Sequence, residues 1–134
     1  MSSPPNAASP APEPTVRTIM LAVSATAAPD TTVGMAHQLM REHGVAHLPV
    51  LDGELLVGIV SRRDLLRAQS DALPLAGVMA RTVFVLSPDT PMSRAARTFR
   101  ERGLPVLPVL DGRKLSGVVR AVDVLETAWD RAKS

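Results

Sequence analysis

The feature that most constrains this chain is an internal repeat with a spacing of 59 residues. When the sequence is shifted by 59 positions, 18 of the 40 residues in 29–68 are identical to their counterparts in 88–127, and no gap is needed. Two copies are too few for a solenoid, which needs at least three stacked units. The repeat therefore predicts two half-domains, related by a pseudo-twofold axis, that cover each other's apolar faces.

Each copy carries the same predicted order of elements, β-α-β-β-α. Apolar residues at helical spacing that end at a glycine predict helices, and short runs rich in Val and Leu predict strands. In the first copy we expect an extended piece before Pro29, a helix over 32–43, strands over 47–51 and 54–60, and a helix from Ser61 to near residue 70. In the second copy we expect a strand near 83–86, a helix over 91–102, strands over 106–110 and 114–119, and a helix over 121–132. The predicted fold class is α+β.

The two strands of each copy flank an Asp-Gly pair, Asp52-Gly53 in the first copy and Asp111-Gly112 in the second. Asp-Gly is typical of a type I′ hairpin loop, which needs positive φ at both central residues. Pro49 and Pro108 lie inside the first strand of each pair. Because proline donates nothing to a strand ladder, we expect these strands at a sheet edge or beside a bulge.

The N-terminal segment differs from the rest of the chain in composition. Residues 1–14 hold five of the twelve prolines and no Val, Ile, Leu or Phe. Such a segment cannot bury enough apolar surface to offset the entropy lost on ordering. We therefore expect a disordered tail over 1–14 and a folded pair of units over 15–134.

Composition excludes several classes of partner. Only 2% of the residues are aromatic, and 15 Lys and Arg stand against 13 Asp and Glu. Nucleic-acid platforms stack bases on aromatic rings and carry a larger basic excess, so we expect no nucleic-acid partner. No apolar run reaches the 18 residues of a membrane span, and no leader pattern opens the chain, so the expected location is the cytoplasm.

The sequence also offers no basis for a metal centre or for catalysis. It has no cysteine, and its three histidines, His37, His43 and His47, are spaced across the predicted stop at Gly44 rather than along one helix face. No glycine-rich phosphate loop, nucleophile elbow or zinc-protease motif is present. We expect a protein that is not an enzyme, with no metal and no required cofactor.

Taken together, these motifs resemble a known family. Met20, Pro29-Asp30-Thr31, Gly44 to Asp52 and Gly58 to Leu65 are similar to a CBS motif, and their counterparts run from Met79 to Val124. The two copies, over about 16–72 and 75–132, therefore resemble a tandem CBS pair, or Bateman module. The resemblance implies a cleft between the repeats in which family members bind AMP, ADP, ATP, S-adenosylmethionine or other nucleotides.

The resemblance implies a first ligand site at the end of the first hairpin. Asp64 would accept hydrogen bonds from the ribose hydroxyls, while Ser61 and the start of its helix would face the phosphates. Arg63 and His47 would add positive charge. The opposite repeat would line the adenine pocket with Met79, Thr82, Phe84, Pro105 and Val106.

A second, weaker site is implied in the second repeat. Asp123 matches Asp64, but Arg120 stands where Ser61 stands, and it either reaches a phosphate or fills the cleft. The expected base pocket of this site is formed by Met20, Val23, Ala25, Ala46 and His47. Ser61-x-x-Asp64 is equally the pattern of a structural capping box, so the two roles stay open at this point.

The expected function is that of a stand-alone regulatory module. It would bind an adenosine nucleotide, work as a homodimer and signal to an unknown effector protein. The alternative is a structural or dimerisation module with degenerate ligand sites, favoured by Arg120 and by the apolar Ala25 and Ala46. Trp129, at helical spacing with Val122 and Leu125, is expected in the core or at a dimer interface.

Overall fold

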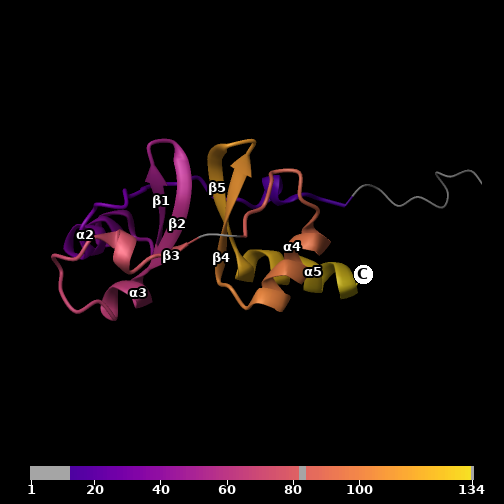
Figure 1. The fold of residues 1–134 in the computed structure, drawn as a ribbon. Helices are drawn as coiled ribbons and strands as arrows, with labels where there is room; N and C mark the ends of the chain where they lie inside the picture. Colours follow the sequence, from indigo (N-terminus) through magenta and orange to yellow (C-terminus); the bar gives the residue numbers. More distant parts are fainter. Residues whose placement is uncertain (1–12, 82–83, 134) are drawn as a thin grey trace, which may run out of the picture.

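The structure, a computed structural model, describes residues 13–81 and 84–133 and places two β-hairpins side by side at its centre (Figure 1). The first half consists of α2 (Val33–His43), β1 (His47–Asp52), β2 (Leu55–Ser61) and α3 (Arg62–Leu66). The second half consists of α4 (Met92–Arg102), β4 (Val106–Asp111), β5 (Lys114–Arg120) and α5 (Ala121–Lys133). Each half keeps its helices on the side of its hairpin that faces away from the other hairpin (Figure 1). The predicted α+β fold is confirmed.

The first helix of each half ends where the sequence predicts. Gly44 and Gly103 both adopt a left-handed conformation with φ of 63°, which ends α2 and α4. The N-terminus of α2 is capped by Thr32, whose hydroxyl accepts a hydrogen bond from the Met35 amide. Pro91 at the same place in α4 gives no side-chain cap, so α4 depends on another part of the chain.

The missing cap of α4 comes from the segment that the sequence assigned to the tail. The carboxylate of Glu13 accepts a hydrogen bond from the Ser93 amide at 2.7 Å, and the Pro14 carbonyl accepts one from the Met92 amide at 3.0 Å. Glu13 and Pro14, which the prediction assigned to the tail, therefore contact the folded unit. The rest of the predicted tail, 1–12, lies outside the described residues.

The hairpin loops differ from the prediction by one residue. Asp52 pairs with Leu55 and Asp111 pairs with Lys114, so the loop residues are Gly53-Glu54 and Gly112-Arg113. Gly53 and Gly112 have φ of 64°, and no described residue other than glycine has positive φ. The type I′ loop centred on Asp-Gly is therefore wrong; a glycine at the first loop position is the pattern of a type II′ loop.

The prolines lie in edge strands, as predicted. β1 is the outer strand of the three-stranded sheet β1-β2-β3, where β3 is Ala80–Arg81, and the register shifts between Val50 and Leu51, next to Pro49. The second half repeats this irregularity one residue after Pro108, in the two-stranded sheet β4-β5. Both prolines therefore sit where no ladder hydrogen bond from their nitrogen is needed.

The first predicted element of each copy is shorter than expected. The extended piece before Pro29 forms a single parallel bridge between Ala27 and Val50, and the strand expected near 83–86 forms a matching bridge between Leu86 and Val109. Residue 83 lies outside the described residues.

The second helix of the first half, α3, ends at Leu66 rather than near residue 70. After Leu66 the chain turns back to α2. The carbonyls of Asp71 and Leu73 accept hydrogen bonds from the first-turn amides Gly34 and Val33. The first amides of a helix have no partner within that helix. Because residues 71–73 supply carbonyl partners for these amides of α2, they cannot continue the helix α3.

Short segments ahead of each copy pack on the other half. The 3-10 helix η1 (Val16–Thr18) buries Val16 in the core of the second half, and its equivalent η2 (Leu75–Gly77) buries Leu75 in the core of the first. Leu21 bridges to Val118 in β5, and Ala80 pairs with Ile59 in β2 at the equivalent place. The two halves are therefore joined by a reciprocal exchange of segments, as the expected pseudo-twofold relation requires.

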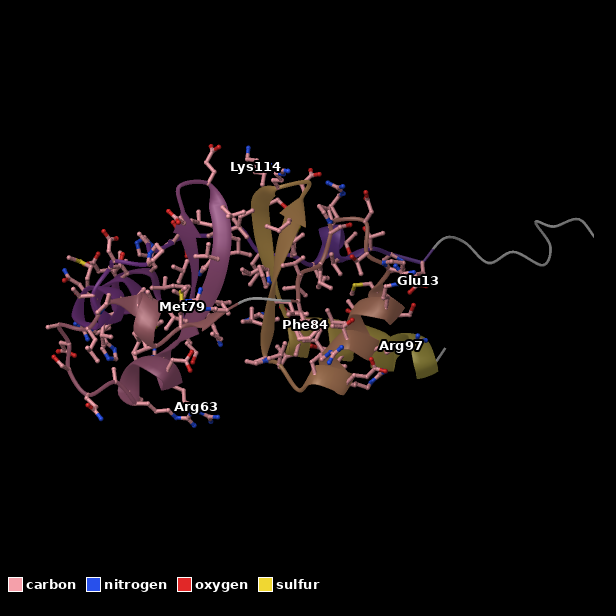
Figure 2. The ribbon with its side chains drawn as sticks, viewed as in Figure 1. Glu13, Arg63, Met79, Phe84, Arg97 and Lys114 are labelled. Carbon is pink, nitrogen blue, oxygen red and sulfur yellow. The ribbon has the colours of Figure 1, made fainter. Side chains whose placement is uncertain are left out.

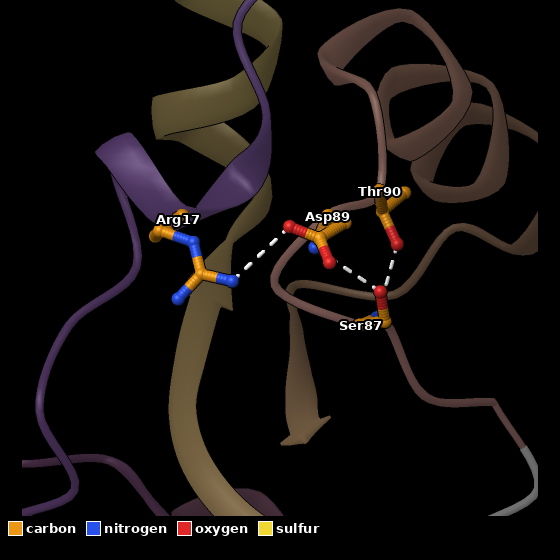
Figure 3. Close-up of polar contacts among 4 residues, drawn as sticks. All are labelled: Arg17, Ser87, Asp89 and Thr90. Atoms are coloured by element: carbon orange, nitrogen blue, oxygen red, sulfur yellow. Dashed lines mark hydrogen bonds and ion pairs between the residues drawn. The ribbon is translucent and has the colours of Figure 1, made fainter. Parts of the chain in front are cut away.

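An ion pair and neighbouring hydrogen bonds connect η1 to the second half (Figure 3). The Arg17 guanidinium contacts the Asp89 carboxylate at 3.1 Å, and the Asp89 amide donates to the Ser87 hydroxyl. Both ends of the ion pair are exposed, so it adds little to stability. The Val16 amide donates to the Thr90 carbonyl at 2.9 Å, which together with the burial of Val16 holds the segment in place.

The apolar core is divided between the two halves. The first cluster is formed by Ala27, Val33, Ala36, Met40, Leu48, Val50, Val60, Leu65 and Leu75. The second is formed by Val16, Leu86, Met92, Ala95, Ala96, Phe99, Leu107, Val109, Val119 and Val124. Because each cluster includes a residue from the exchanged segment of the other repeat, neither repeat can complete its core from its own residues.

Candidate functional site

A cavity of about 590 Å³ opens between the two halves, where α3 begins and where β4 begins. It is lined by Ala46, His47, Ile59, Ser61, Arg62, Arg63, Asp64, Ala80, Gly103, Leu104, Pro105 and Val106. The first half thus supplies the polar side chains and the second half supplies an apolar wall. A volume of this size is typical of small-ligand sites.

Ser61 and Asp64 occupy the entrance to α3 and cap it reciprocally. The Asp64 amide donates to the Ser61 hydroxyl at 3.0 Å, and the Ser61 amide donates to Asp64 Oδ2 at 2.9 Å. The capping box is therefore present. Asp64 Oδ1 accepts no hydrogen bond from the described residues and belongs to a side chain that lines the cavity. The cap consequently leaves half of this carboxylate available to a ligand.

The polar side of the cavity carries an excess of basic groups. Arg62 and Arg63, the first two residues of α3, line it together with His47 at the start of β1. Asp64 is the acidic residue among the lining side chains. Figure 2 shows Arg63 on α3 at the edge of the molecule, with its side chain extending outward. This arrangement attracts an anion and leaves one carboxylate beside it.

His47 is half-buried on the cavity wall. Burial lowers the pKa of His47 below its ordinary value of 6.5, and the neighbouring Asp64 carboxylate opposes this effect by favouring the charged imidazole. Burial is the larger influence. At neutral pH the imidazole is therefore uncharged, and the two arginines supply the positive charge of the site.

The lowered pKa of His47 predicts a loss of stability on acidification. Between pH 6.5 and the lower pKa of the folded protein, the unfolded chain binds more protons than the folded one, so the free energy of unfolding falls as the pH is lowered. His47→Gln is expected to reduce this slope, whose limit for one proton is about 1.4 kcal/mol per pH unit. The measurement is urea unfolding at several pH values between about 5 and 7.5.

The exposed His43 at the end of α2 offers a matched substitution, His43→Gln, which removes a histidine without touching the cavity. A His47→Gln profile that runs parallel to the wild-type profile would show that this imidazole is not the buried titrating group.

The structure gathers most of the residues predicted for the first site. His47, Ser61, Arg63, Asp64, Pro105 and Val106 all line the cavity. Met79 lies on the first half and Phe84 on the second, and neither lines the cavity (Figure 2). Met79 covers Gly58 on β2, the Phe84 ring lies 4.2 Å below the Arg102 guanidinium, and Thr82 lies outside the described residues.

The residues predicted for the second site are dispersed. Ala46 and His47 line the cavity beside Asp64, and Ala25 packs against the core of the first half. Met20 packs against the core of the second half, and Val23 lines a separate cavity of about 860 Å³ between the hairpin loops. Asp123 lines neither of these two cavities.

Asp123 itself is held by its neighbour. Arg120 Nε donates to Asp123 Oδ2 at 2.8 Å, and Arg120 Nη2 donates to Oδ1 at 2.9 Å, a bidentate pair. These hydrogen bonds raise the pKa of Arg120 above its already high value, so the guanidinium stays charged. Both carboxylate oxygens that a ribose would need are thus engaged.

Sequence reasoning missed several lining residues. Arg62 lies within the quoted Ser61-to-Asp64 motif, Gly103 is the predicted stop of α4 and Leu104 follows it, so their positions gave a usable signal. No comparable signal marked Ile59 and Ala80, because these two residues are brought together at the cavity by the pairing of β2 with β3.

The sequence predicts neither a metal site nor a membrane span, and the described part of the chain can be searched for both. Within residues 13–81 and 84–133, no three His, Asp or Glu side chains are grouped in a way that could hold a metal ion. No helix in the same part is both long enough and apolar enough to cross a membrane.

Comparison with known proteins identifies the fold. The CBS domain family matches residues 16–71 and again residues 75–130. Inosine-5′-monophosphate dehydrogenase of Korarchaeum cryptofilum is 36% identical over 74% of this chain, and the chain spans 21% of the length of that relative.

Two solved structures are closely similar in shape. CBSX2 in complex with AMP is 28% identical, with a TM-score of 0.76 over 89% of this chain and 98% of that one. The CBS domain pair of MJ0100, in complex with 5′-methylthioadenosine and S-adenosyl-L-methionine, has a TM-score of 0.79 over 90% of this chain and 99% of that one, at 24% identity. With two family matches in tandem and the same fold, the chain belongs to the CBS domain family and forms a CBS pair.

Proposed function

We propose that this protein is a regulatory module that binds an adenosine nucleotide in the cavity between α3 and β4. The observation that carries the proposal is Asp64: its Oδ1 accepts no hydrogen bond from the described residues, and the residue lines the cavity together with two arginines and an apolar wall. These are the three chemistries of a nucleoside phosphate. A carboxylate accepts hydrogen bonds from a ribose diol, guanidinium groups bind phosphate, and an apolar wall takes a flat base.

The charges of the site favour adenosine phosphates over S-adenosylmethionine. Arg62 and Arg63 lie next to Asp64 on the same turn of α3. A phosphate gains charge-assisted hydrogen bonds there, whereas a sulfonium cation meets two like charges. We therefore expect AMP, ADP or ATP as ligand. The AMP that CBSX2 binds supports this assignment.

The same helix links the ligand to a surface for a second copy. α3 lines the cavity with Asp64 in its first turn and ends at Leu66, a residue that is 71% exposed. Val122 on α5 is 64% exposed, and α3 and α5 lie on the side of the molecule away from the hairpin loops (Figure 1). We propose that these apolar residues form the seam of a homodimer. The side chain of Trp129, expected in the core or at this seam, lies outside the described residues.

A ligand changes such a dimer only if it binds its two arrangements differently. The short α3 couples the two events, because a nucleotide held at Asp64 restrains the helix that carries Leu66. The signal would pass to a separate effector protein. The proposal gives the module no catalytic role and places it in the cytoplasm with the nucleotides it would bind.

The test is a thermal-shift and calorimetric series with AMP, ADP, ATP and S-adenosylmethionine. A ligand at about 100 times its Kd is expected to raise the free energy of unfolding by about 2.7 kcal/mol. We expect the adenosine phosphates to stabilise the protein more than S-adenosylmethionine does. If none of the four compounds has an effect at millimolar concentration, the proposal fails for these ligands.

One observation favours the second candidate, a structural or dimerisation module with degenerate sites. Asp123 is already paired with Arg120, which is the arrangement expected of a lost ligand site. A dimer that forms without any ligand response in the same series would support this candidate.

A further inference from the structure

We propose that Arg120 closes the ribose position of the second repeat, so that this chain holds one nucleotide, at Asp64. The inference rests on the proposed function and adds the number of ligands and the residue that sets it. It is carried by a comparison of the two repeats, which place matching residues in matching elements but give the two aspartates different partners.

The local frames of the two aspartates are the same. β2 ends at Ser61 and β5 ends at Arg120, and each is followed at once by a helix whose third residue is the aspartate, Asp64 or Asp123. The register of the two hairpins is also the same, with His47 opposite Ser61 and Val106 opposite Arg120. The difference between the sites therefore lies in the side chains and not in the course of the backbone.

The residue before each helix decides the state of each carboxylate. Ser61 is too short to reach past the cap, so it leaves Asp64 Oδ1 without a partner among the described residues. Arg120 reaches both oxygens of Asp123 and presents a guanidinium fork that matches them at 2.8 and 2.9 Å. A ribose diol can bind Asp123 only after the Arg120 guanidinium has been displaced from the carboxylate.

The positions that bind phosphate in the first cavity are also lost in the second repeat. Ala121 and Val122 stand where Arg62 and Arg63 stand. Once Arg120 is engaged by Asp123, the residues at these three positions offer no cation for a phosphate. The second position is thus closed to the diol and unattractive to the phosphate.

Two reciprocal substitutions test the inference. In Ser61→Arg, a guanidinium is placed one turn before Asp64 as in the second repeat, and AMP binding is expected to be lost. In Arg120→Ser, Asp123 is released, and the number of adenosine molecules bound per chain is expected to rise from one to two. Adenosine is the probe for Arg120→Ser because the opened position lacks cations for a phosphate.

Isothermal titration calorimetry of the full chain gives the stoichiometry, and urea unfolding of each variant shows that the fold is retained. Arginine already occupies the equivalent position of the second repeat, so Ser61→Arg is expected to be compatible with the fold. Wild-type protein that binds two AMP molecules would overturn the role of Arg120 while leaving the proposed function intact, and so would Arg120→Ser that still binds one adenosine. Wild-type protein that binds neither AMP nor adenosine would overturn the proposed function itself.

Discussion

Asp64→Asn is expected to weaken AMP binding by about ten- to a hundredfold. Asparagine keeps the size of the side chain and an oxygen that can accept from the Ser61 amide, so the cap of α3 is preserved. It loses the negative charge, and charge-assisted hydrogen bonds to ribose are stronger than neutral ones, a difference that over two hydroxyls amounts to about 1.4–2.8 kcal/mol. Calorimetric titration of AMP into wild type and variant gives the ratio of the two Kd values.

The equivalent substitution in the second repeat separates ligand contact from fold. Asp123→Asn removes the partner of Arg120 at the same position of the same motif. Because we place the nucleotide at Asp64, this variant is expected to bind AMP with nearly wild-type affinity. Equal losses in the two variants, or no loss in Asp64→Asn, would place the ligand elsewhere.

Gly58→Ala is expected to be the most destabilising of the glycine substitutions, by about 1–3 kcal/mol. A Cβ at Gly58 would lie 2.6 Å from the Ala80 carbonyl oxygen and 3.0 Å from Met79 Sδ. The methionine can move, but the carbonyl belongs to β3, which among the described residues is joined to β2 at two residue pairs, Gly58 with Arg81 and Ile59 with Ala80. The close approach of these backbones needs a residue without a Cβ.

The measurement is the midpoint of urea unfolding at unchanged m-value. Gly77→Ala is the control, because a Cβ there meets nothing within 4 Å and the residue is not at positive φ. Gly117→Ala is the matched case in the second half, where the Leu21 carbonyl oxygen lies 2.9 Å from the added Cβ, and a smaller loss is expected. A Gly58→Ala protein as stable as Gly77→Ala would mean that β3 is free to move away from β2.

The same substitution is expected to disturb the ligand site. Ala80 and Ile59, which pair across β2 and β3, both line the cavity beside Asp64. Displacing β3 by the width of a methyl group moves one wall of the cavity. AMP affinity of Gly58→Ala, measured at a temperature where the variant is folded, is therefore expected to fall as well.

Most of the fold was predictable because it depends on local signals. Helix stops at Gly44 and Gly103 follow from the preference of glycine for left-handed φ, and the proline strands lie at edges because proline cannot donate. The capping box at Ser61 and Asp64 is likewise a four-residue pattern. The loop type was mispredicted, since the pairing of Asp52 with Leu55 depends on register along the whole hairpin.

The candidate site was predictable only in part. His47, Ser61, Arg63 and Asp64 lie in one repeat close to one motif, and the cavity keeps them together. Residues assigned to the opposite repeat were less accurately placed, because Phe84 is covered by Arg102 and Val23 lies at the hairpin loops. The sequence left open whether Arg120 reaches a phosphate or fills the cleft, and it did not predict the ion pair of Arg120 with Asp123 that the structure shows.

The sequence by itself determined that two similar units fold and pair, because the spacing of apolar residues and the turn residues indicate which face of each element must be buried. Only the tertiary structure decided what buries each face. The exchange that places Val16 in the second core and Leu75 in the first joins residues far apart along the chain, and no local pattern specifies such a partner. For the same reason the state of each aspartate, open at Asp64 and closed at Asp123, became visible only when the side chains around it were assembled in space.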